Sequence, residues 1–159
     1  MRSLGFSMIK LENSYPTVTR DELEDIFAEV ELKFPDSYIE FLLAQNGGFP
    51  KIESAYICED DLEYQIFINC FYGVSKSETN IELLCARGSH RHTIPESLCP
   101  IADDGIGNQI CIGIQEPYFG KVYFWNKDDE VDYGEEITFD NIELLAGSFA
   151  SFINSVRSI

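Results

Sequence analysis

Residues 98–126 read LCPIADDGIGNQICIGIQEPYFGKVYFWN, and the fold that this sequence predicts is organised around them. Three short runs rich in β-branched and aromatic residues alternate with turns, and they lie at 98–102, 108–114 and 121–126. The first turn contains Gly105 and Gly107, and the second contains Pro117, which are residue types that reverse the chain. This arrangement predicts a meander of antiparallel strands.

Successive side chains of these strands point to opposite faces of the sheet. Ile110 and Ile112 share one face of the second strand. In the third strand, Trp125 lies opposite Phe124. Trp125 is the one tryptophan of the chain, and we expect it to pack into the core. Anchoring of a protein interface is the alternative role for this residue.

Two amphipathic helices are predicted before the sheet. Thr19 and Glu22 form a capping box that begins the first helix. Its apolar stripe at helical spacing consists of Leu23, Ile26, Phe27 and Val30. The second helix follows Pro35 and carries Tyr38 on its apolar face. It ends at 46–48, Asn-Gly-Gly, because glycine accepts the left-handed backbone of a helix stop.

Further elements are predicted on both sides of the meander. Runs at 52–58 and 64–72 predict a hairpin around an acidic turn at 59–63, with both faces of the second run covered. A short helix is predicted over 80–87, ending at Gly88.

The chain is predicted to end in a helix. Asp140 with Glu143 resembles its cap, and its apolar stripe consists of Phe149, Phe152, Ile153 and Val156. Two helices, a sheet with a short middle helix, and a closing helix predict an α+β fold. We expect residues 1–159 to form a single domain.

Charge restricts the partners of this chain. Eleven Lys and Arg against 28 Asp and Glu give a net charge of −17. Phosphate groups are repelled by a field of this sign, which argues against nucleic acid and anionic membranes as partners and permits a basic protein. Residues 64–95 alone lean basic, and they contain Arg87, Arg91 and both histidines.

The five cysteines are Cys58, Cys70, Cys85, Cys99 and Cys111, and they form no CxxC pair. We expect reduced core residues in a cytoplasmic protein. No apolar run approaches the roughly 20 residues of a membrane span, and the first residues lack the features of a secretory signal.

Catalytic and metal-binding motifs are weak. No motif of nucleotide-binding, serine-hydrolase or zinc-protease type occurs. Asp128, Glu130 and Asp132 have the first spacings of a calcium loop, but Tyr133 and Phe139 stand where Gly and Glu are required. A solvated acidic loop is the favoured interpretation.

Histidines provide the remaining candidates for chemistry. His90 and His92 would share one face of an extended segment and could bind a metal, although no third ligand stands at motif spacing. A nucleophilic pair of Cys99 with His92 is a further alternative. Ordinary loop histidines are favoured over both.

Exposed turns on a rigid sheet suit recognition of another molecule. We therefore expect a partner to contact the acidic turns, with the candidate binding residues Asp103, Asp104, Asp128, Asp129, Glu130 and Asp132.

Four segments in this order resemble the SUKH superfamily, at 34–48, 101–112, 120–126 and 148–153. This superfamily contains bacterial immunity proteins and yeast regulators of cell-wall glucan synthesis. The motif residues that carry the resemblance are Pro35, Tyr38, Gly47, Gly48, Gly105, Gly107 and Trp125. One departure is Lys127, which stands where relatives often carry a histidine after the strand tryptophan.

The resemblance implies an α+β fold with a central, mostly antiparallel sheet, and neither catalytic residues nor a cofactor. It implies a cytoplasmic protein that binds a cognate toxin and blocks it. A nucleic-acid-directed toxin needs a basic surface, which the acidic chain could occupy. A regulatory or scaffold module of the same fold is the first alternative. A small metal-dependent enzyme using His90 and His92 is the second.

Overall fold

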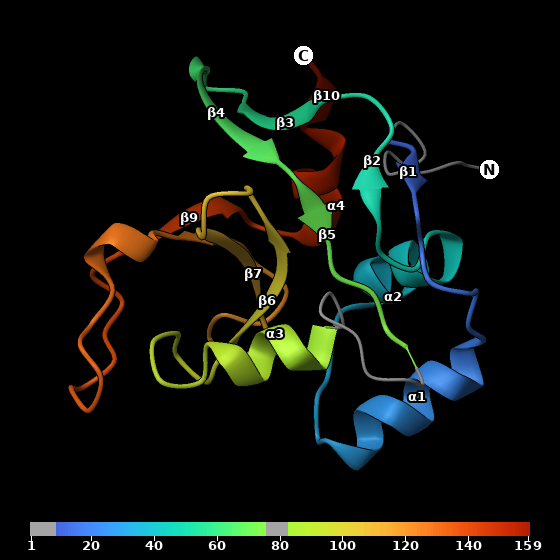
Figure 1. Cartoon of the computed structure of the whole chain (residues 1–159), viewed down its shortest axis with the longest axis horizontal. Coiled ribbons are helices and arrows are strands. Elements are labelled where there is room, and N and C mark those ends of the chain that lie inside the picture. The colour runs from blue at the N-terminus through green and yellow to red at the C-terminus, as the bar shows by residue number, and fades with distance from the viewer. Residues whose placement is uncertain (1–8, 76–82) are drawn as a thin grey trace.

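The computed structural model describes residues 9–75 and 83–159, and it confirms the α+β class (Figure 1). Its helices are α1 (Arg20–Glu29), α2 (Asp36–Ala44), α3 (Leu83–Ser89) and α4 (Phe149–Asn154). Every pair of neighbouring strands in the described sheets is antiparallel.

Strands of the described residues lie in three sheets. The central one has five strands in the order β5 (Cys70–Phe71), β6 (Leu98–Asp103), β7 (Gln109–Gly113), β8 (Val122–Trp125) and β9 (Ile142–Ala146). The second has three, in the order β10 (Val156–Ser158), β3 (Ser54–Cys58) and β4 (Asp61–Ile68). The third is the pair of β1 (Leu11–Glu12) and β2 (Phe49–Pro50).

The meander is confirmed as β6, β7 and β8, and the central sheet separates two apolar clusters. Ile110 and Ile112 belong to the main core with the helices. On the opposite face, Tyr123 and Trp125 form a smaller cluster. Trp125 is fully buried, which confirms the prediction that it packs inside the protein.

The predicted capping box begins α1. The Thr19 hydroxyl accepts from the backbone N–H of Glu22 at 3.1 Å, and the Glu22 carboxylate accepts from the Thr19 N–H at 2.9 Å. Leu23 and Phe27 are buried as predicted. The expected burial of Val30 is wrong, because the helix ends at Glu29 and Val30 remains 43% exposed.

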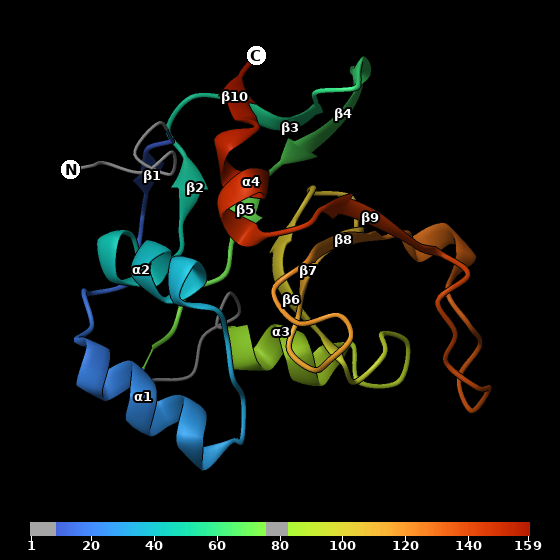
Figure 2. The same ribbon diagram turned by 180° about the vertical axis from the view of Figure 1, so that it is seen from behind.

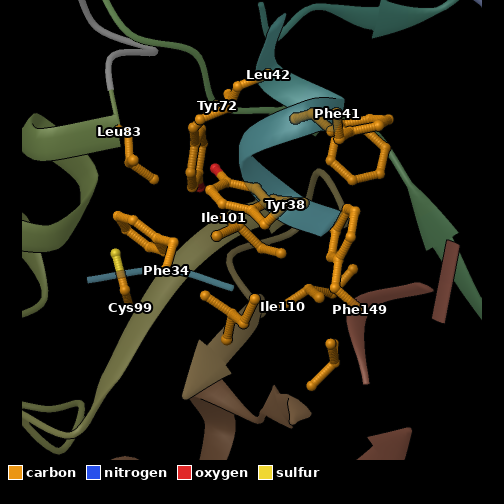
Figure 3. Close-up of a cluster of buried hydrophobic side chains, with 14 of the residues drawn as sticks. Phe34, Tyr38, Phe41, Leu42, Tyr72, Leu83, Cys99, Ile101, Ile110 and Phe149 are labelled. Carbon is orange, nitrogen blue, oxygen red and sulfur yellow. The ribbon is translucent and has the colours of Figure 1, made fainter. Parts of the chain in front are cut away.

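Helix α2 packs its aromatic side chains into the core, where α4 meets them (Figures 2 and 3). The rings of Tyr38 and Phe149 lie edge to face, with centroids 5.2 Å apart. After the helix, the buried amide of Asn46 accepts from the N–H of Val74 at 2.8 Å and donates to the carbonyls of Val74 and Pro16. Gly47 follows with φ +72°, and a Cβ there would lie 2.5 Å from the backbone nitrogen of Gly73. The Asn-Gly-Gly segment therefore holds two distant loops together.

The predicted hairpin at 52–72 forms, but its turn consists of residues 59–60 instead of 59–63, because β4 already begins at Asp61. Its second strand is also not continuous. β4 ends at Ile68, and after Asn69 the chain enters β5 of the central sheet. The prediction that both faces of this second run are covered is wrong, because Phe67 is 41% exposed. The physical reason is that this antiparallel sheet packs on the core through one face, so Ile66 and Ile68 are buried while Phe67 points to the solvent-exposed face.

The C-terminal region differs most from the prediction. Residues 142–146 form β9 rather than the start of a helix, so the expected cap by Asp140 and Glu143 is wrong. β9 supplies the backbone partners that the outer edge of β8 requires. Helix α4 begins after Ser148, whose hydroxyl accepts from the N–H of Ser151 at 3.1 Å. Val156 lies in β10 and not in the helix.

The middle helix α3 ends at Ser89 rather than at Gly88, and residues 80–82 of the predicted helix lie outside the described residues. All five cysteines are free, and Cys70, Cys99 and Cys111 are buried as predicted. Cys58 is half-buried and packs against the main core, whereas the expected core position of Cys85 is wrong, because this residue is exposed.

Candidate functional site

An acidic loop leaves the central sheet after β8 and extends away from the body of the protein (Figure 1, orange). It begins with the short 3-10 helix η2 (Lys127–Asp129). The Asn126 side chain caps this turn by accepting from the backbone N–H of Asp128 at 3.0 Å. The predicted binding residues of the loop are all exposed to solvent, namely Asp128, Asp129, Glu130 and Asp132.

A cavity of about 400 Å³ lies where the base of this loop meets the edge strands β4 and β9. We call it the acidic cleft. Three carboxylates line it, from Asp129, Asp140 and Glu143, beside the rings of Tyr64 and Phe124. Among the described residues, no Lys or Arg contributes to the lining. The cleft therefore suits a cationic group.

Hydrogen bonds fix the walls of the acidic cleft. The backbone N–H of Asn126 donates to the carbonyl of Asn141 at 3.0 Å, and the Asn141 side chain donates back to the carbonyl of Asn126 at 2.9 Å. The Tyr64 hydroxyl on β4 donates to the Glu143 carboxylate on β9. A second hydroxyl, from Tyr56 on β3, donates to the carbonyl of Leu145 at 2.7 Å.

The contact between Tyr64 and Glu143 also affects titration. Burial, followed by the hydrogen bond to Glu143, raises the pKa of the Tyr64 hydroxyl. Tyr64 therefore keeps its proton and acts as a donor, which holds the carboxylate of Glu143 in place.

The predicted pair Asp103 and Asp104 lies at the turn between β6 and β7. One carboxylate oxygen of Asp104 accepts from the N–H groups of Ile106 and Asn108 at 3.0 and 3.1 Å, and the other from the Asn108 side chain at 2.7 Å. Asp103 is half-buried and accepts from the Asn69 side chain at 3.1 Å. Burial raises the pKa of Asp103. Both carboxylates thus have structural partners, Asp104 within the turn and Asp103 at Asn69, which lies between β4 and β5.

The structure brings the two predicted acidic turns next to each other. The N–H of Lys127, at the start of the acidic loop, donates to the Asn108 side chain at 2.8 Å. The aliphatic stem of Lys127 lies over Gly107, where an added Cβ would meet its Cδ at 2.5 Å. Lys127 therefore serves to join the turn and the loop.

The two histidines have different surroundings. His90 is half-buried with its ring edge to face against Trp125, with centroids 5.3 Å apart. His92 is exposed and contacts Tyr133 of the acidic loop at 5.1 Å between centroids. Within residues 9–75 and 83–159, no group of three or more His, Cys, Asp or Glu is placed to hold a metal ion.

The suggested pairing of Cys99 with His92 is wrong. Cys99 is fully buried in the main core, and burial raises the pKa of its thiol to about 12. Its sulfur contacts the carbonyl of Pro100 at 3.6 Å. A thiol of this kind forms no thiolate near neutral pH, so it cannot act as the nucleophile.

Sequence reasoning missed Tyr64, Asp140 and Glu143 as residues of the site. Asp140 and Glu143 were assigned to a helix start, whereas they line the cleft beside β9. The available signal was the run Ile142, Glu143, Leu144, which fits a strand as well as a helix cap. Tyr64 carried no signal, because its partner is 79 positions away.

The motif residues that carry the resemblance to the SUKH superfamily occupy positions that shape the fold. Pro35 is the N-cap of α2, and Tyr38 and Trp125 are buried. Gly47, Gly48, Gly105 and Gly107 all have positive φ. A search of the described helices finds none with the length and apolar character needed to cross a membrane.

Comparison with known proteins identifies the family of this chain. The model of the SMI1 / KNR4 family (SUKH-1) matches residues 17–155. The chain is also 24% identical over 161 aligned positions to the SPbeta prophage-derived uncharacterized protein YokK of Bacillus subtilis (strain 168). That match covers 89% of this chain and 77% of YokK. No solved structure matches. Because the family model spans most of the sequence, this chain belongs to the SMI1 / KNR4 family (SUKH-1).

Proposed function

We propose that this protein is an immunity-type inhibitor, which binds a cognate protein toxin and blocks it by covering a basic surface. The acidic cleft carries this proposal, since three carboxylates converge there without a lining Lys or Arg among the described residues. The exposed acids of the adjoining loop extend the same negative surface. A nucleic-acid-directed toxin offers the complementary charge, because it must hold phosphate.

Specific contacts follow from the chemistry of the cleft. A lysine or arginine of the toxin would meet the carboxylates of Asp129, Asp140 and Glu143. The rings of Tyr64 and Phe124 would add cation–π attraction. Tyr133, 84% exposed in the acidic loop, is the aromatic side chain best placed to anchor a surrounding interface.

Binding and not catalysis is the proposed activity. Of the catalytic candidates in the sequence, Cys99 is buried as a neutral thiol, and His90 and His92 face different aromatic rings. We also propose a cytoplasmic location. The proposed toxin acts on nucleic acid in the cytoplasm, so its inhibitor must be present there.

The test is inhibition of the toxin encoded beside this protein. Equimolar inhibitor should abolish the toxin's activity, and the two proteins should co-elute as a complex on size exclusion. Full toxin activity at equimolar ratio would contradict the proposal for that pair. A chain encoded without any neighbouring toxin gene would favour the regulatory module instead.

A further inference from the structure

Basic side chains of this acidic chain gather around a second cavity, of about 250 Å³, beside the end of α3. We call it the arginine pocket. Its polar lining comes from Arg87, His90 and Arg91 together with one acid, Glu96. Its apolar walls include Ile94, Leu98 and Ile137. The function proposed above uses none of these residues, so the arginine pocket requires its own explanation.

The two arginines place their positive charges at the same pocket. Arg87 and Arg91 are four positions apart. Helical hydrogen bonding continues past the end of α3, because the N–H of His90 donates to the carbonyl of Ala86 at 3.2 Å. Like charges at this spacing repel each other. Within residues 9–75 and 83–159, neither guanidinium pairs with a carboxylate, and their partners are the carbonyls of Glu96 and Gly88.

Hydrogen-bonding capacity remains unused at this site. Arg87 donates from Nη2 to the Glu96 carbonyl at 3.5 Å, the limit of a hydrogen bond, and its buried Nε–H has no acceptor among the described residues. A buried donor without an acceptor is unfavourable. Since one weak contact holds the guanidinium, a modest rotation would present its Nε and Nη groups to an incoming acceptor.

The form of the arginine pocket selects among anions. A planar guanidinium donates two parallel hydrogen bonds to the two oxygens of a carboxylate. The apolar walls cannot replace the water around a doubly charged phosphate, whereas they suit a hydrocarbon stem. Burial lowers the pKa of His90, against an opposing effect of Glu130, so this ring contributes a neutral hydrogen-bonding group. The volume is below the roughly 300–1,000 Å³ of pockets for drug-sized ligands.

We propose that the arginine pocket is a binding site for a carboxylate carried on a short apolar stem, such as a small carboxylic acid or the side chain of glutamate. This site is separate from the acidic cleft, and it does not depend on the identity or existence of a toxin. Its position gives a convenient reporter, because His90 of the lining contacts Trp125, the one tryptophan of the chain.

The test is titration of the full chain followed by tryptophan fluorescence and by NMR. Butyrate should give a saturable change, while butyramide, which has the same shape without charge, should give none. N-acetylglutamate α-amide forms a second arm, and tighter binding of it than of butyrate would identify a protein side chain as the source of the carboxylate. Inorganic phosphate is the third arm and should bind more weakly than either.

Variants make the test specific. Arg91→Gln, at an exposed residue, should weaken butyrate binding about tenfold through loss of a charged hydrogen bond. Glu96→Gln removes a carboxylate from the rim and should strengthen it. Lys51→Gln, at a cavity lined by other residues, is the control and should leave it unchanged. Equal responses to butyrate and butyramide, tighter binding of phosphate, or unchanged affinity in Arg91→Gln would each overturn the proposal.

Discussion

The hydroxyl of Tyr64 on β4 donates a hydrogen bond to the carboxylate of Glu143 on β9, across 79 positions of sequence. These are edge strands of two different sheets, so one side-chain contact joins the sheets at the wall of the acidic cleft. The geometry of the proposed binding site therefore depends on how the sheets are held together as well as on its charges.

Removal of this hydroxyl tests that dependence. Tyr64→Phe should lower the free energy of unfolding by about 1.5 kcal/mol, the lower end of the range for a hydrogen bond to a charged group, because this contact is solvent-exposed. It should also weaken toxin binding. Urea denaturation and calorimetry would measure the two effects. Tyr118→Phe is the matched control, because that ring packs on Phe139 and Tyr123 without a hydroxyl hydrogen bond among the described residues. Equal effects in both variants would contradict the assigned role of Tyr64.

Charge reversal tests the proposed docking surface. Asp128→Lys with Asp129→Lys should slow association with the toxin, because the opposite fields that steer the encounter are weakened. Glu24→Lys with Asp25→Lys changes the net charge equally on exposed positions of α1 and should slow it far less. Stopped-flow association rates at low and physiological salt would decide. Equal slowing in the two variants would remove the acidic loop from the interface.

The burial of Trp125 predicts a large effect on stability. Trp125→Ala should lower the free energy of unfolding by about 3–5 kcal/mol, because it leaves a cavity in the smaller apolar cluster. Tyr133→Ala, at a side chain 84% exposed, should change it by less than about 0.5 kcal/mol. Urea unfolding followed by far-ultraviolet circular dichroism measures both, and a small loss in Trp125→Ala would show that this cluster contributes little.

The raised pKa of Asp103 predicts a dependence of stability on pH. Burial raises it above the usual 3.8, so the free energy of unfolding falls as the pH rises from 3.8 to the higher pKa of the folded state, and the loss is complete above that pKa. Asp103→Asn keeps an oxygen for the Asn69 side chain and removes the charge. It should therefore be more stable than the natural chain at pH 7, and the difference should disappear as the pH falls below 3.8. Thermal unfolding across this range is the measurement, and a difference independent of pH would contradict the assignment.

Local patterns predicted most elements of this fold. The capping box of Thr19 and Glu22 and the alternation in β7 and β8 depend on neighbours within a few residues, and both are present. The predicted glycine stop of α2 is wrong, because the helix ends at Ala44 with Gln45 in an extended conformation, and Gly47 instead allows the close approach to Gly73. Errors occurred where a local pattern permitted two structures. Residues 140–143 suited a helix cap, but residues 142–146 pair with the edge of β8 and form β9.

By itself, the sequence determined the charge of this protein, its α+β class, the meander and the exposure of the acidic loop, because composition and short-range periodicity are written along the chain. Only the tertiary structure decided that Asp129, Asp140 and Glu143 meet Tyr64 in one cleft, and that Arg87 and Arg91 flank another. The physical reason is that such contacts arise from the packing of sheets and helices far apart in sequence. No spacing rule records that packing.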